Sequence, residues 1–294
     1  MTTIKNGRRI LLIVGMHRSG TSLCGHLINT LGYDVTDKTG PAFDNPKGHW
    51  ERSDAVAFHD RILAAMRRHW ASPAHTAPLP PAWWGRPDIR AIRNEMISWL
   101  ARLIETSPHF AIKDPRLSLL LPVWREICAE LAIEADHIFC VRHPAQVVRS
   151  LVHRDKMAAV EAEFRWFIYN IRAVQGLGDA PVCVVPYEDW FAADSRNLGR
   201  ITAYLNSPWR ADDPMLRDAV GSIIDRDLRH DDGSVYPSAP LARLHGLLEE
   251  AAEPGRFSRE LLAYAAAFSD FERLFPADAA AQTGPRAAAA KGAP

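Results

Sequence analysis

The chain has 294 residues, of which 47% are hydrophobic, and its 35 basic and 35 acidic side chains give a formal net charge of zero. This length and apolar share are typical of one large domain of three-layer type. Zero net charge excludes a chain-wide field that would attract nucleic acid or an anionic membrane. We therefore expect no nucleic-acid partner, and any anion site has to be built locally.

The four cysteines stand far apart in apolar stretches, with neither a C-x-x-C pair nor metal-ligand spacing, which favours buried free thiols in a reducing compartment. No apolar run approaches the ~20 residues that span a bilayer. The basic segment 5–9 is followed by only five apolar residues, too few for a signal peptide. We predict a cytoplasmic protein without a transmembrane segment, and an acceptor at a membrane face is compatible with this.

The first element is an unbroken apolar run, Ile10 to Val14, which predicts a buried parallel strand. Gly15 and Gly20 bracket the loop that follows, and apolar residues then recur at helical spacing between positions 23 and 31. A strand, a glycine-bracketed loop and a helix N-terminus present free N–H groups and the positive end of a dipole. The sequence therefore predicts an anion site here.

This loop differs from a Walker A loop in a way that bears on its ligand. Gly15, Gly20 and Ser22 have the Walker spacing, but Thr21 stands in the lysine position and the cation is Arg18, inside the loop. A nucleoside triphosphate site needs that lysine, and an aspartate for magnesium. The loop suits one phosphate held by N–H groups and hydroxyls, with a guanidinium alongside. The alternative is an ordinary strand-to-helix turn with an incidental arginine.

The loop reads GMHRSGTS and resembles the 5′-phosphosulfate loop of sulfotransferases that use 3′-phosphoadenosine 5′-phosphosulfate (PAPS), most of all the bacterial ones. The resemblance implies that the cofactor is bound by Gly15, His17, Arg18, Ser19, Gly20, Thr21 and Ser22. Many family members carry Lys in place of Arg18. A guanidinium keeps the charge but does not release a proton, so a catalytic role of Arg18 must be electrostatic.

Residues 33–52 form a polar, turn-rich segment that ends in Glu51, where we predict that a helix begins. The Asn-Pro-Lys-Gly stretch at 45–48 also resembles the bacterial family, with His49 inserted before the aromatic residue. Glu51 has two open interpretations: a first-turn acid that favours the helix dipole, or the general base for the acceptor. The other candidates for the base are His49, His17 and Asp114.

Residues 71–88 are rich in proline and contain Trp83 and Trp84, so we expect little regular structure. The two tryptophans either anchor the loop to the core or stack on the acceptor, and we take this loop as the candidate acceptor region. An amphipathic helix is predicted from Ile89 to Ile104.

The next predicted strand, 109–112, runs into Lys113-Asp114-Pro115-Arg116 and a leucine-rich helix. Charges where a strand ends are costly unless an anion or a partner is present. The four residues resemble a bacterial sulfotransferase motif, which implies a catalytic contact of Lys113 with the transferred group. A structural Asp114–Arg116 pair is compatible with that contact.

The third predicted strand, 137–142, ends in Arg142, where kinases and ATPases place a magnesium-binding aspartate. Ser150 follows eight residues later on a predicted helix. The pair resembles the family's 3′-phosphate motif, and a guanidinium with a hydroxyl suits a phosphate monoester. The alternative is that Ser150 only packs against the sheet.

The remaining elements are predicted as a helix over 161–176, a strand over 181–185 and helices over 241–252 and 258–275. Tyr187 and Glu188, after the last strand, are interpreted as structural support for the loop. Relatives cover the cofactor with a late basic segment, which implies Arg229 as a cofactor candidate.

We predict an α/β fold of three α/β/α layers with a central parallel sheet and P-loop-type topology. We expect one domain over residues 1–275, including the 71–88 loop, and a disordered Ala-rich tail over 276–294. The resemblance implies metal-free transfer of a sulfuryl group from PAPS to a hydroxyl or amine of a small-molecule or glycan acceptor, with a carbohydrate or glycolipid as the family-level expectation. The alternatives are an ATP-dependent P-loop kinase and a non-catalytic nucleotide-binding protein.

Overall fold

The computed structural model describes residues 9–36, 48–70, 72–107, 109–192, 196–223, 236, 238–253 and 255–272. The stretch 45–47, Arg229 and the tail 276–294, all singled out in the sequence, lie outside the described residues.

Four parallel strands form the sheet, in the order β2-β1-β3-β4. The strands are β1 (Arg9–Gly15), β2 (Ala111–Lys113), β3 (Glu134–Val141) and β4 (Cys183–Pro186). Ile13 of β1 pairs with Lys113 on one side, and Gly15 pairs with Cys140 on the other. The carboxyl ends of β1, β2 and β3 therefore meet at one edge, where loops of parallel sheets carry ligands.

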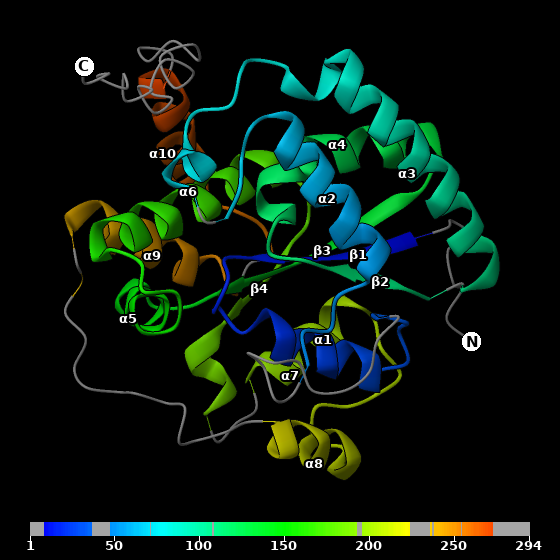
Figure 1. Ribbon diagram of the computed structural model, residues 1–294. Helices are drawn as coiled ribbons and strands as arrows, with labels where there is room; N and C mark the ends of the chain where they lie inside the picture. Colours follow the sequence, from blue (N-terminus) through cyan, green and yellow to red (C-terminus); the bar gives the residue numbers. More distant parts are fainter. Residues whose placement is uncertain are drawn as a thin grey trace, which may run out of the picture.

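Helices cover both faces of this sheet (Figure 1). Residues 10, 12 and 14 of β1 face one apolar core, and residues 11 and 13 face another. The first core is completed by α2 (Ser53–Ala65), α3 (Pro87–Thr106), α4 (Leu117–Glu130), α5 (Pro144–Asp155), α6 (Ala159–Leu177), α9 (Ala239–Glu250) and α10 (Arg259–Glu272), and the second by α1 (Thr21–Thr30), α7 (Arg196–Tyr204) and α8 (Pro214–Ile223). This arrangement confirms the predicted three-layer α/β/α fold with a parallel sheet.

One local prediction needs correction. Glu51 does not begin a helix, because α2 begins at Ser53 with Arg52 at the N-cap, and the acid of its first turn is Asp54. The 71–88 loop contains two short 3₁₀ turns, η1 (Pro73–Thr76) and η2 (Trp83–Gly85). Trp83 of η2 is buried in the first core and Trp84 packs against it, so this pair anchors the loop.

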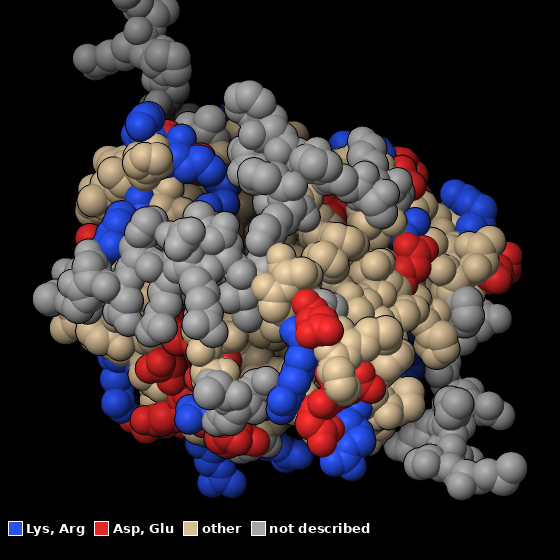
Figure 2. All heavy atoms as spheres, turned by 90° about the horizontal axis from the view of Figure 1, so that it is seen from below, with Lys and Arg blue, Asp and Glu red and all other residues tan. Residues whose placement is uncertain are grey.

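All four cysteines are buried and free, as predicted. Burial raises the pKa of the Cys183 thiol to about 12, so this thiol stays protonated and unreactive at neutral pH. No helix within the described ranges is long and apolar enough to cross a membrane. The face in Figure 2 carries both blue and red side chains, with a wide area of uncharged residues between them.

Candidate active site

Two glycines allow the β1–α1 loop to pack closely against its neighbours. Gly15 has a φ of 145°, and a Cβ there would lie 2.5 Å from the Cys140 carbonyl oxygen on β3. Gly20 has a φ of 84°, and its Cβ would lie 2.6 Å from the ring of Tyr187. Only glycine tolerates this backbone at this spacing. The loop is therefore fixed against β3 and Tyr187, with the first turn of α1 leaving amide donors at its mouth.

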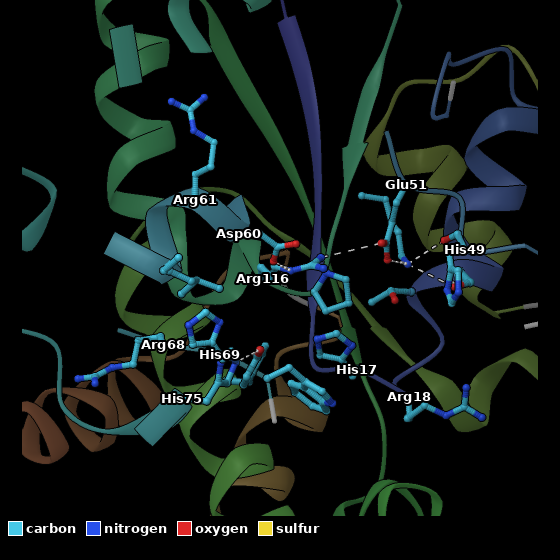
Figure 3. A pocket seen from close by; sticks show the side chains of 18 of the residues that line it. His17, Arg18, His49, Glu51, Asp60, Arg61, Arg68, His69, His75 and Arg116 are labelled. Atoms are coloured by element: carbon cyan, nitrogen blue, oxygen red, sulfur yellow. Dashed lines mark hydrogen bonds and ion pairs between the residues drawn. The ribbon is translucent and has the colours of Figure 1, made fainter. Parts of the chain in front are cut away.

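Arg18, Arg142 and Ser150 meet beside this loop, although they come from three elements. Arg18 has a φ of 68°, and its Nε donates to the Ser150 hydroxyl on α5 at 2.8 Å. Arg142 follows β3, and one of its terminal nitrogens donates to the Arg18 carbonyl oxygen at 3.1 Å. The structure thus links the three residues through Arg18, whose backbone bonds Arg142 and whose side chain bonds Ser150. The Arg18 guanidinium points away from Glu51 (Figure 3).

Arg142 is buried and has no anionic partner within the described residues. Its side chain donates to the Gln146 amide oxygen at 2.9 Å and lies 4.0 Å from the centre of the Tyr187 ring. In the part of the chain that the structure describes, no carboxylate lies within ion-pair distance of it. Burial lowers the pKa of the Arg142 guanidinium, Tyr187 and Glu188 oppose this, and Arg149 adds to it; the group remains protonated at neutral pH. A buried cation of this kind is costly until an anion binds.

Lys113 lies on the opposite side of the loop, at the end of β2. Its ammonium donates to the Glu51 carboxylate at 2.7 Å, to the His49 carbonyl oxygen at 2.9 Å and to the Ser22 hydroxyl at 3.3 Å (Figure 3). The Lys113 side chain is 2% exposed. One buried ammonium therefore links the loop helix to the segment that carries Glu51.

The segment 48–51 is fastened to α1. The Trp50 ring stacks on His26 with centroids 4.4 Å apart and an interplanar angle of 18°. A Cβ on Gly25 of α1 would lie 3.0 Å from the Cβ of Trp50, so glycine lets the segment cross close to the helix. The Thr36 hydroxyl also donates to the Glu51 carbonyl oxygen at 3.0 Å. These contacts hold Glu51 at the pocket.

Asp114 anchors a buried network behind Lys113. Trp124 donates to His59 Nε2 at 2.9 Å, and because indole is only a donor, His59 carries its proton on Nδ1. That Nδ1 donates to one Asp114 oxygen at 2.7 Å, and the other oxygen accepts from the Arg116 backbone at 2.9 Å and from its guanidinium at 2.8 Å. Both oxygens of the fully buried carboxylate are committed, so Asp114 is poorly placed to act as the general base.

Arg116 connects this network to the pocket. Its Nε forms an ion pair with Asp60 Oδ1 at 2.8 Å, and a terminal nitrogen lies 4.0 Å from Glu51 Oε2. Burial alone would raise the pKa of Asp114, but Arg116 and His59 outweigh it and hold that pKa well below its usual range. The Asp114–Arg116 pair expected from the sequence is therefore present, and it supports the charged wall of the pocket.

A pocket of about 710 Å³ opens between this charged wall and a wall of rings. Its basic side chains are Arg18, Arg61, Arg68, Lys113, Arg116 and Arg154, and its carboxylates are Glu51 and Asp60. His17, Trp70, His75 and Tyr169 form the ring wall, where the Tyr169 hydroxyl lies 2.6 Å from His75 Nε2. Burial, followed by the charge of Arg165, lowers the pKa of His75 to about 3, so its imidazole is neutral. The excess of cations suits an anionic ligand.

No family model and no curated protein matches this sequence. Among solved structures, the chain is similar to the sulfotransferase domain of the Synechococcus PCC 7002 olefin synthase, with a TM-score of 0.43 and 18% identity over 91% of this chain and 97% of that one. It is also similar to the sulfotransferase domain from the curacin biosynthetic pathway, with a TM-score of 0.43 and 15% identity over 88% of this chain and 97% of that one. What this chain binds has to follow from its own side chains.

The predicted site residues fall into three groups in the structure. The pocket is lined by His17, Arg18, Thr21, Ser22, His49, Glu51 and Lys113. Arg142 and Ser150 lie beside the loop, outside the pocket lining, and are joined to it through Arg18. Ser19 is buried, and its hydroxyl has no partner within the described structure.

Sequence reasoning missed several pocket residues, among them Trp70, Tyr169 and Asp60. Trp70 immediately precedes the proline-rich loop, and Tyr169 lies within the helix predicted over 161–176. Their sequence positions weakly indicated core residues and gave no indication of a pocket. In the proline-rich loop it is His75, and neither Trp83 nor Trp84, that reaches the pocket. Among the described residues, no group of three or more His, Cys, Asp or Glu side chains could hold a metal ion.

Proposed function

We propose that this protein transfers a sulfuryl group from PAPS to a hydroxyl or amine of an acceptor. The observation that carries the proposal is the buried guanidinium of Arg142, which lacks a carboxylate partner within the described chain and donates to the backbone of Arg18, the residue whose side chain bonds Ser150. PAPS carries a 3′-phosphate monoester and a 5′-phosphosulfate. Arg142, Arg18 and Ser150 would hold the monoester, and the loop amides with Thr21 and Ser22 would hold the 5′-phosphate.

The transfer needs three things from the protein: alignment, charge stabilisation and a proton acceptor. An acceptor oxygen attacks sulfur, the bond from sulfur to the 5′-phosphate oxygen breaks, and 3′,5′-diphosphoadenosine leaves. Lys113, held between Ser22 and Glu51, would stabilise the negative charge on the sulfuryl oxygens. The acceptor proton goes to a pocket base, for which the family resemblance favours Glu51 and the pocket also offers His17.

The acceptor would occupy the part of the pocket away from the loop. Trp70 and Tyr169 offer ring faces there, and aromatic faces are suited to the apolar faces of sugar rings. A carbohydrate or glycolipid acceptor, expected from the family resemblance, is compatible with these side chains. The proposal therefore includes a glycan-type acceptor.

The first prediction tests the 3′-phosphate site. Arg142→Ala should weaken binding of 3′,5′-diphosphoadenosine by several-fold to hundreds-fold, corresponding to the ~1.5–3 kcal/mol of a charge-assisted contact. Binding of adenosine 5′-phosphate should barely change, because that ligand lacks the 3′-phosphate. Isothermal titration calorimetry with both ligands measures the difference, and equal losses would remove Arg142 from this role.

The second prediction concerns metal dependence. Thr21 stands in the Walker lysine position, and the first residue after β3 is Arg142 where a kinase would place a magnesium carboxylate. We expect sulfuryl transfer to survive EDTA with at most a modest change of the kind that added salt produces. Complete loss in EDTA, with recovery on addition of magnesium, would favour the ATP-dependent kinase instead.

A further inference from the structure

We infer that the His17 imidazole takes the proton from the acceptor, and that Glu51 positions Lys113. This inference rests on the proposed sulfuryl transfer and assigns a role within it. His17 would act as a catalytic residue in contact with the acceptor, whereas Glu51 would act through the Lys113 ammonium, 2.7 Å away.

The placement of His17 is the first argument. It precedes Arg18 in the loop that would hold the 5′-phosphosulfate, and its ring lies in the middle of the pocket, between the side of Glu51 and the side of His75 (Figure 3). Across the described chain, neither ring nitrogen of His17 has a hydrogen-bond partner. An imidazole nitrogen is thus available to a ligand close to the reacting group.

The orientation of the ring is also fixed. The His17 ring lies 4.2 Å from that of Trp70 and meets the Tyr169 ring edge-on at 5.7 Å. Trp70 in turn lies 4.5 Å from the guanidinium carbon of Arg165, which donates to the backbone oxygens of Trp70 and Ser72. Arg165 is 1% exposed, so the support for Trp70 is rigid.

Burial and the charges around His17 keep its imidazole in the neutral form, the form that can accept a proton. Burial lowers the pKa of His17 well below 6.5, and Arg116, Lys113 and Arg154 add to this while Asp114 opposes it. The ring is therefore neutral at neutral pH, and its ring-wall neighbours His75 and Tyr169 are uncharged there as well. Bound PAPS would bring negative charge to these cations. We expect this to raise the pKa of His17 towards neutrality, where a general base is most effective.

The Glu51 carboxylate, unlike the His17 ring, already has charged partners. Oε1 lies 2.7 Å from the Lys113 ammonium, and Oε2 lies 4.0 Å from the Arg116 guanidinium. Protonating this carboxylate would break an ion pair in the step that needs Lys113 in place. Both oxygens of Glu51 thus face cations, and Oε1 is committed to holding Lys113 in place.

The reaction is a single sulfuryl transfer accompanied by one proton transfer. The acceptor oxygen forms a bond to sulfur, and the bond from sulfur to the 5′-phosphate oxygen breaks with its electron pair. The acceptor proton moves to a ring nitrogen of His17, which becomes an imidazolium. After 3′,5′-diphosphoadenosine and the sulfated product leave, the imidazolium returns its proton to water.

The test compares His17→Ala with Glu51→Gln, the matched variant at the rival base. The assay is single-turnover transfer of labelled sulfate from saturating PAPS, with the lysate fraction that accepts most label from the wild-type protein as acceptor. His17→Ala should lose about 10²–10⁴-fold in rate, as expected for loss of a general base, and Glu51→Gln should lose clearly less. Free imidazole should restore activity to His17→Ala and have no effect on Glu51→Gln.

The pH profile gives a second readout. The wild-type rate should fall on the acid side as His17 becomes protonated, Glu51→Gln should keep this acid limb, and His17→Ala should lose it. Near-normal transfer by His17→Ala, or a larger loss in Glu51→Gln without imidazole rescue of His17→Ala, would overturn the inference.

Binding of 3′,5′-diphosphoadenosine, measured by calorimetry, separates the remaining outcomes. It should be nearly unchanged in His17→Ala and in His17→Asn, which keeps a polar side chain but cannot accept the proton. If both variants lose nucleotide binding, His17 only shapes the loop and the inference is wrong. If the wild-type protein moves no label to any fraction, the proposed function itself fails, and the inference fails with it.

Discussion

Asp114→Ala is expected to lower the free energy of unfolding by about 3–5 kcal/mol, the usual cost of removing one partner of a buried ion pair. Asp114 is fully buried and accepts hydrogen bonds from His59 at 2.7 Å and from Arg116 at 2.8 Å. The substitution removes the acceptor of the buried His59 Nδ1–H and of one terminal nitrogen of Arg116, whose Nε still pairs with Asp60. Urea denaturation, monitored by tryptophan fluorescence, measures the loss.

The matched control is Glu95→Ala, which removes the partner of Arg61 from an exposed ion pair whose bonds are 2.6 Å long. Because solvent screens this pair, its loss should leave the free energy of unfolding almost unchanged. Similar small losses in both variants would contradict the structural role given to Asp114.

The same carboxylate predicts a pH dependence of stability. The pKa of Asp114 is lower in the folded chain than its ordinary value of 3.8, so the folded state favours the ionised form. Its stabilising contribution is complete above pH 3.8 and is lost as the pH falls below that value towards the folded pKa. Denaturation curves of wild type and Asp114→Ala should therefore converge under strongly acidic conditions, and a constant difference down to low pH would contradict this account.

Lys113→Met is expected to lower single-turnover sulfuryl transfer by about 10²–10³-fold, the usual effect of removing one donor to a developing negative charge. Its ammonium lies within 3.3 Å of Ser22 and 2.7 Å of Glu51, at the junction of loop and pocket. Affinity for 3′,5′-diphosphoadenosine should change little, because that product has lost the sulfuryl group. Quench-flow assays with labelled PAPS and calorimetry with the product separate the two effects.

Lys113→Arg keeps the charge but changes the shape of the donor, so it should retain more transfer than Lys113→Met. Transfer by Lys113→Met within a few-fold of wild type, at saturating PAPS, would exclude a role in the chemical step. Equal losses in the two variants would show that shape, and not charge, is what the site requires.

The sheet, and the edge of it that carries the candidate site, were predictable because they depend on local patterns of apolar residues in the sequence. Continuous apolar runs identified all four strands, and parallel strands must end at a common edge. That argument alone places the loop after Gly15 near Lys113 and Arg142, which end or directly follow neighbouring strands. The pairing of Arg142 with Ser150, by contrast, came from the resemblance to the sulfotransferase 3′-phosphate motif, and in the structure Ser150 lies on α5, the helix that follows Arg142.

The directions of side chains were not predictable in the same way. Arg18 could equally have turned towards Lys113, and only the packing of α5 shows that its Nε meets Ser150. Trp70 and Tyr169 have the apolar pattern of core residues, so their pocket faces depend on how α6 packs against the proline-rich loop. The Glu51–Lys113 ion pair likewise depends on a segment crossing α1, which no sequence period encodes.

Transfer of labelled sulfate from PAPS to lysate fractions of the source cell tests the central claim most directly. The account predicts that purified protein moves label into at least one fraction, that EDTA does not stop it, and that Arg142→Ala reduces it at limiting PAPS. Tight binding of 3′,5′-diphosphoadenosine without transfer of label to any fraction would contradict the account and favour a non-catalytic nucleotide-binding protein. Magnesium-dependent transfer of the γ-phosphate of ATP would contradict it in favour of a kinase.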